Sequence, residues 1–127
     1  MMTSKKWVYF DVDDTLLIWP TKVDKYPDLP KISVENPYYS DSPYSTHPKY
    51  IPLQIHTTHL ENLKEHHTNG DIIVVWSRGG KQWADAAVDA LGIRDMVYCT
   101  LTKPDITYDD EPYKNWLPHL PRWREPK

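Results

Sequence analysis

The chain has 127 residues, a length that favours one domain large enough to bury a hydrophobic core. Charged residues make up 26% and hydrophobic residues 39%, as in ordinary globular proteins, and the net charge of −3 argues against general electrostatic binding of nucleic acid. No apolar run reaches the roughly 20 residues needed to span a bilayer, no secretory signal is evident, and the single Cys99 cannot form an internal disulfide. We therefore expect one cytoplasmic domain, residues 1–127, with no membrane partner.

The first predicted element is a strand over Trp7–Val12. Its residues are apolar, aromatic or β-branched, which is typical of a parallel strand buried on both faces. An acidic segment, Asp11 to Asp14, begins at the end of this strand. The end of this strand is therefore the first candidate position in the chain for chemistry that uses carboxylates.

A segment rich in proline and tyrosine follows, over about residues 19–51. Its prolines remove backbone donors and bias the preceding residues away from helix, so we expect an irregular insert with at most a short hairpin. Loops of this length in compact domains tend to be functional or disordered, and the tyrosines favour packing over disorder. The insert is predicted to be an ordered lid, too short for a full cap domain.

Helices and strands are predicted to alternate beyond the insert. Helical spacing of Leu53, Leu60 and Leu63 predicts a helix over Leu53–Thr68, which Asn69-Gly70 would end. A second helix is predicted over Lys81–Leu91, with Gly92 as its terminator. The remaining elements are strands at Asp71–Trp76, Met96–Leu101 and Ile106–Tyr108, and a short tail helix near Tyr113–Leu117.

This alternation indicates an α/β domain with a mainly parallel sheet and flanking helices. Such sheets bind ligands beyond the carboxyl ends of their strands. The polar residues there are of the types that phosphoryl transfer requires, namely a nucleophile, a proton donor and positive charge against the phosphate. A carboxylate attacks a phosphate only beside a cation, and Mg²⁺ prefers oxygen ligands. The residues concerned are Asp11, Asp13, Ser77, Arg78, Lys103, Asp109 and Asp110.

The first half of this set resembles the haloacid dehalogenase (HAD) superfamily. Its first motif, DxDx[TV], is matched by Asp11, Asp13 and Thr15. Its second motif, a serine or threonine that ends an apolar strand, is matched by Ser77. Asp14 stands where the family often has glycine.

The second half of the set follows the same family order, so the resemblance covers roughly residues 7–117. The third motif is a lysine or arginine, matched by Lys103, although Lys81 is also available. The fourth is an acidic pair after an apolar strand, matched by Asp109-Asp110. The close spacing of these two motifs is similar to that of small capless members, such as polynucleotide 3′-phosphatase domains and short phage-like phosphatases.

The resemblance implies a Rossmann-like HAD fold and a role for each residue. Asp11 would be the nucleophile that forms an aspartyl-phosphate, and Asp13 the acid/base. Ser77 and Lys103 would hold the phosphoryl oxygens, and Arg78 offers a further cation. Mg²⁺ would be held by Asp11, by the main-chain carbonyl of Asp13 and by the Asp109-Asp110 pair, with Asp110 as the favoured direct ligand and Asp109 behind it.

The expected function is hydrolysis of a phosphomonoester with Mg²⁺ as cofactor. The substrate favoured first is a nucleotide or a nucleic-acid terminal phosphate, and a sugar phosphate second. Trp19 and the tyrosines of the insert either stack on a base or only pack. Two other classes stay open: a catalytically silent HAD-like binding protein and a receiver-like phospho-accepting signalling module. The sequence leaves the oligomeric state open.

Six histidines raise the question of zinc. His56 and His67 fall on the apolar face of the first predicted helix, and no cysteine accompanies them. We favour satisfied core histidines over a zinc site.

Overall fold

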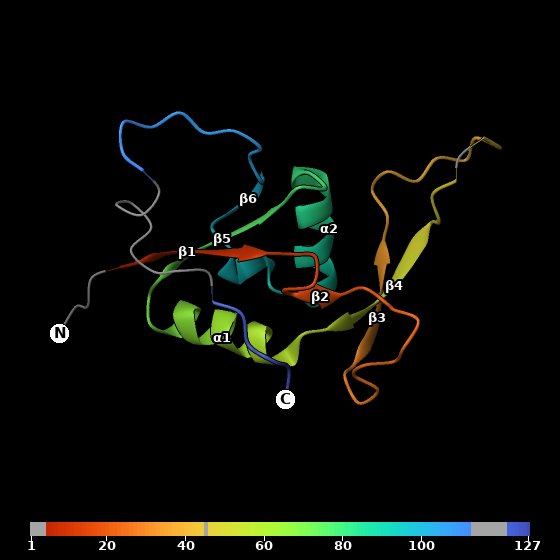
Figure 1. Ribbon diagram of the computed structural model, residues 1–127, viewed down its shortest axis with the longest axis horizontal. Coiled ribbons are helices and arrows are strands. Elements are labelled where there is room, and N and C mark those ends of the chain that lie inside the picture. The colour runs from red at the N-terminus through yellow and green to blue at the C-terminus, as the bar shows by residue number, and fades with distance from the viewer. Residues whose placement is uncertain (1–4, 45, 113–121) are drawn as a thin grey trace.

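The computed structural model describes residues 5–44, 46–112 and 122–127, which form an α/β fold with two small sheets (Figure 1). The first sheet is parallel, in the order β1 (Trp7–Asp11), β5 (Ile72–Ser77), β6 (Cys99–Thr102). The second is antiparallel, in the order β2 (Leu17–Ile18), β4 (Tyr50–Ile55), β3 (Lys31–Glu35). The helices are α1 (Thr57–Thr68), α2 (Lys81–Leu91) and the short 3-10 helix η1 (Arg94–Met96).

The predicted α/β class with a mainly parallel sheet is confirmed for the sheet that contains β1. Its central strand, β5, has Ile73, Val74 and Val75 fully or almost fully buried, as expected for a parallel strand with neighbours on both sides. In the described ranges, no helix is both long and apolar enough to cross a membrane.

The expectation that β1 is buried on both faces is wrong. Phe10 points into the core, but Trp7 and Tyr9 are exposed, because side chains alternate along a strand and the described helices leave this face uncovered. Trp7 instead packs edge-on against Tyr98, and Tyr9 against Trp76, across the outer face of the sheet.

Helix α1 begins later than predicted. Leu53, expected on the helix, is a buried residue of β4, which pairs with both β2 and β3. The helix starts at Thr57, after the side chain of His56 accepts a hydrogen bond from the backbone of His59 as an N-cap. His67, expected on the buried face, is consequently exposed.

Two predictions concern the C-terminal part of the chain. Ile106–Tyr108 forms no strand, so that prediction is wrong. The tail helix near Tyr113–Leu117 lies outside the described residues. Residues 122–127 run beside the start of α1, where Arg124 hydrogen-bonds to His59 and His56.

Helix α2 joins the two sheets. It was correctly predicted, with Trp83, Ala84, Ala87 and Val88 buried and Gly92 in the left-handed conformation that ends it. It packs against β5 and β6 on one side and against β3 of the insert on the other (Figure 1). The insert is therefore held next to the carboxyl ends of the parallel strands.

Candidate functional site

The carboxyl ends of the three parallel strands meet at one edge of the sheet. Asp11 is the last residue of β1 and Ser77 the last of β5, while Lys103 directly follows β6. The backbone N–H of Lys103 donates to the carbonyl of Ser77 at 2.9 Å. Three segments that are far apart in sequence thus supply adjacent polar groups.

A tight loop after β1 directs the acidic side chains. The carbonyl of the fully buried Val12 accepts backbone hydrogen bonds from Thr15, Leu16 and Leu17, at 3.0 to 3.2 Å. Asp14 has φ +59°, in the left-handed region that aspartate tolerates better than most residues. This conformation gives a physical reason why glycine would also suit the position.

The carboxylate of Asp11 lies between a cation and a hydroxyl. Its Oδ1 is 3.9 Å from Nζ of Lys103, and its Oδ2 accepts a hydrogen bond from Oγ1 of Thr15 at 3.4 Å. Burial raises the pKa of Asp11, Lys103 lowers it, and the neighbouring carboxylate of Asp13 raises it. The net result is a raised pKa, because desolvation outweighs the distant amine.

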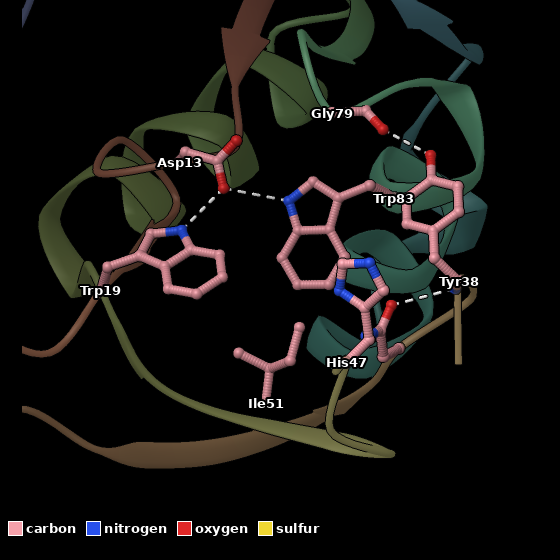
Figure 2. Close-up of a pocket in the computed structure, with 8 residues that line it drawn as sticks. Asp13, Trp19, Tyr38, His47, Ile51, Gly79 and Trp83 are labelled. Atoms are coloured by element: carbon pink, nitrogen blue, oxygen red, sulfur yellow. Dashed lines mark hydrogen bonds between the residues drawn. The ribbon is translucent and has the colours of Figure 1, made fainter. Parts of the chain in front are cut away.

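The carboxylate of Asp13 accepts hydrogen bonds from three side chains, and Figure 2 shows the two that come from Trp19 and Trp83. Oδ1 is 2.7 Å from Nε1 of Trp19 and 3.0 Å from Nε1 of Trp83. Oδ2 is 3.1 Å from Oγ of Ser77. The side chain is therefore fixed by the insert, by α2 and by β5 together.

The sequence did not predict that the indole N–H groups of Trp19 and Trp83 donate to Asp13. Trp83 is buried in α2, as the apolar spacing predicts, but it also bonds Asp13. A buried tryptophan needs a partner for its N–H, and this was the available signal. Spacing alone cannot identify that partner, since Asp13 and Trp83 are 70 residues apart.

Of the two lysines considered for the third motif, only Lys103 lies beside Asp11. Its Nζ is also 5.9 Å from the ring centroid of Trp76, within cation–π range. Lys81 forms an ion pair with Asp85 at 2.8 Å, one turn further along α2. Arg78 is exposed and forms no ion pair within the described residues.

The acidic pair Asp109-Asp110 is not brought to the other carboxylates. Both residues are exposed, and Asp109 accepts a hydrogen bond from the backbone of Glu111. Among the described residues, no three His, Cys, Asp or Glu side chains are grouped closely enough to hold a metal ion. The segment after Lys103 leaves the sheet edge without forming the strand that would return these carboxylates to it.

The oxygen groups at the end of β1 nevertheless have the chemistry that a hard cation prefers. The carboxylate of Asp11 is only partly enclosed, and oxygen donors suit Mg²⁺, which commonly uses one or two carboxylates together with water and substrate phosphate. The side chain of Asp13 is occupied by its three donors, so its main-chain carbonyl is the group left for a metal.

Comparisons with protein-family models, with curated proteins and with solved structures found no match to this chain. The reading of the site therefore depends on its motif residues and their geometry.

Proposed function

We propose that the protein is a Mg²⁺-dependent phosphomonoester hydrolase of HAD type that works through an aspartyl-phosphate. The proposal rests on one observation, the contacts that the carboxylates of Asp11 and Asp13 make. Asp11 has Lys103 beside it, and Asp13, two residues on, is hydrogen-bonded to Ser77. Nucleophile, cation, hydroxyl and acid/base thus stand within one small group.

In the proposed first step, a carboxylate oxygen of Asp11 forms a bond to phosphorus as the ester P–O bond breaks. The leaving alkoxide takes a proton from Asp13, which must be protonated at that moment. In the second step, Asp13 removes a proton from water, the water oxygen bonds to phosphorus, and the acyl-phosphate bond to Asp11 breaks. Phosphate leaves and Asp13 is protonated again.

The remaining groups offset charge. The ammonium of Lys103 and the hydroxyl of Ser77 are suited to bind phosphoryl oxygens as negative charge shifts among them. Mg²⁺, held by Asp11 and the carbonyl of Asp13, would neutralise the phosphate enough for a carboxylate to approach it. The raised pKa of Asp11 agrees with a partly desolvated carboxylate in such a site.

Hydrolysis of a panel of phosphomonoesters tests the proposal. Wild-type protein with Mg²⁺ should release phosphate from at least one substrate, and Asp11→Asn should lower kcat/KM by about a thousandfold or more, since no nucleophile remains. Intact-mass analysis after an acid quench should detect a phosphoryl adduct on wild type and none on Asp11→Asn.

Asp14→Asn is the matched control. It removes the same charge three residues away, and asparagine also tolerates a positive φ. This variant should keep most of the activity. If wild type and Asp11→Asn release phosphate equally slowly from every substrate, the protein is not a phosphatase.

One observation favours the silent binding protein as the second candidate. Asp109 and Asp110, which would complete the fourth motif, are not grouped with Asp11 and Asp13 in the described structure. For a silent protein, phosphoester binding would persist in Asp11→Asn and wild type alike, with no phosphate release. The same panel therefore separates the two candidates.

A further inference from the structure

A cavity of about 360 Å³ opens beside the carboxylate of Asp13 (Figure 2). Its wall combines residues of the insert with residues of the parallel-sheet half of the protein. The lining residues are Asp13, Trp19, Asn36, Tyr38, His47, Ile51, Gly79 and Trp83. It lies on the side of the site where the insert faces α2.

The insert is tied across this cavity by two side chains. The hydroxyl of Tyr38 donates to the carbonyl of Gly79, in the turn after β5. Nε1 of Trp19, at the start of the insert, donates to Asp13. A Cβ added to Gly80 would come within 2.6 Å of the Tyr38 hydroxyl, which shows how closely that ring approaches the turn. The cavity is therefore built by the fold and not left by a loose loop.

The position of the cavity identifies the part of a substrate that it would hold. In the proposed mechanism, Asp13 protonates the oxygen of the leaving group. That oxygen must lie within hydrogen-bond reach of Asp13. The group attached to the oxygen then extends into the space that Asp13 borders, which is this cavity.

The walls favour a flat aromatic group. Trp19 is 37% exposed and Tyr38 is 44% exposed, so both rings retain open surface, and Ile51 adds an aliphatic side. Stacking of one base on such rings changes affinity by about tenfold to a hundredfold.

The volume and charge favour a single nucleotide over a nucleic-acid end. About 360 Å³ is within the range of small-molecule pockets. A polynucleotide would need several cations along its backbone, whereas the carboxyl ends of β5 and β6 are followed by Arg78, Lys81 and Lys103, of which Lys81 is paired with Asp85. We propose that the cavity binds the nucleobase of a nucleoside monophosphate, so that the leaving group is a nucleoside; this rests on the proposed phosphatase function.

Binding to Asp11→Asn tests the cavity without requiring turnover. Isothermal titration in the presence of Mg²⁺ would use AMP, UMP, ribose 5-phosphate and inorganic phosphate as separate ligands. We expect at least one nucleotide to bind ten times or more tightly than ribose 5-phosphate. Adding Tyr38→Ala should remove most of that preference while leaving the affinity for ribose 5-phosphate within about twofold.

Tyr44→Ala is the matched control, because Tyr44 is a tyrosine of the same insert that is 90% exposed and does not line the cavity. It should leave every affinity unchanged. If nucleotides bind no better than ribose 5-phosphate, or if Tyr38→Ala and Tyr44→Ala behave alike, the nucleobase assignment is overturned even when wild type hydrolyses ribose 5-phosphate. If the nucleotide preference and its dependence on Tyr38 persist while wild type hydrolyses nothing, the cavity assignment stands and the phosphatase proposal falls.

Discussion

The imidazole rings of His56 and His59 are stacked, with centroids 3.7 Å apart and 2° between their planes. Both side chains are buried. His56 accepts from the backbone N–H of His59 at Nδ1, so its proton is on Nε2, which donates to the carbonyl of Arg124. His59 accepts from the N–H of Arg124 at Nε2 and donates from Nδ1 to the carbonyl of Thr15.

Two neutral histidines in opposite tautomers thus connect the C-terminal segment to the loop after β1. The expectation of a satisfied core histidine is confirmed for His56. Trp123 packs edge-on against both rings and donates from Nε1 to the carbonyl of Asp14. A proton added to the accepting nitrogen of either ring would face a backbone N–H and break that contact.

Stability should therefore fall on mild acidification. Burial and then the neighbouring His59 lower the pKa of His56 below its usual 6.5. Because the unfolded chain takes up this proton first, the contribution is fully present above about pH 6.5 and is lost as pH falls through the lowered pKa. Urea unfolding between pH 7.5 and about 5 should show a slope of up to about 1.4 kcal/mol per pH unit from this site.

His56→Asn is the variant that isolates the effect. Asparagine is a favourable N-cap, so it can replace the bond to the start of α1, but it does not titrate. We expect a loss of about 1 kcal/mol at pH 7.5, for the missing bond to Arg124, and a flatter pH dependence. An unchanged slope would show that another group controls the acid sensitivity.

Lys103 should control both the rate and the acid limb of the proposed reaction. It lowers the pKa of Asp11, which burial raises. In Lys103→Met this opposing effect is lost, so ionised Asp11 requires a higher pH, and the acid limb of the kcat/KM–pH profile should move upward. Loss of the cation should also reduce kcat by about a hundredfold.

Lys81→Met is the control for Lys103→Met. It removes the same charge from a lysine that pairs with Asp85, away from Asp11. Its acid limb should coincide with that of wild type. If Lys103→Met and Lys81→Met gave the same kcat/KM–pH profile, Lys103 would have no role in the proposed reaction.

Trp83→Phe should weaken both the site and the fold. The ring stays in the core, but Asp13 loses one donor, and a hydrogen bond to a charged group is worth about 1.5–3 kcal/mol. We expect a loss of about 1–3 kcal/mol in the free energy of unfolding and about a tenfold lower kcat, with KM for a small phosphoester unchanged. Trp7→Phe, at an exposed position of β1, should alter neither. If Trp83→Phe kept the kcat of wild type, Trp83 would have no role in positioning Asp13.

Asp85 should stabilise the packing of α2 against β6. Burial opposes its ionisation, but hydrogen bonds from Lys81, Thr100 and Arg94 outweigh burial and lower its pKa to about 2. The stabilisation is present above the unfolded value of 3.8 and is lost as pH falls through about 2.

Asp85→Asn should cost about 1–2 kcal/mol at pH 7 and flatten the pH dependence of urea unfolding below pH 4. Asp89→Asn, which removes an exposed partner of Arg94, should cost less than about 0.5 kcal/mol. Equal losses for the two variants would contradict the special role of Asp85.

The sequence predicted correctly those elements whose own residues form a strong local pattern. The apolar run at β5 predicted a strand, and the apolar spacing of α2 predicted a helix, and both predictions are correct. A buried central strand and a capped amphipathic helix leave strong local patterns. Leu53 was wrongly predicted to lie on a helix, because its spacing to Leu60 and Leu63 fits the period of a helix. Pairing of β4 with β2 and β3 overrode that pattern, and such pairing is invisible at short range.

The sequence alone placed Asp11 and Ser77 at the carboxyl ends of parallel strands, because those positions follow from chain order and the rules of parallel sheets, but it wrongly placed Asp109-Asp110 after a further strand. It predicted that Asp11, Ser77 and Lys103 would share an edge. That Trp19 and Trp83 both donate to Asp13, and that the insert borders an open cavity beside it, followed only from the tertiary structure. These contacts depend on how α2 orients the insert, and packing between distant segments is specified by shape and hydrogen bonding across the whole core, not by any local repeat.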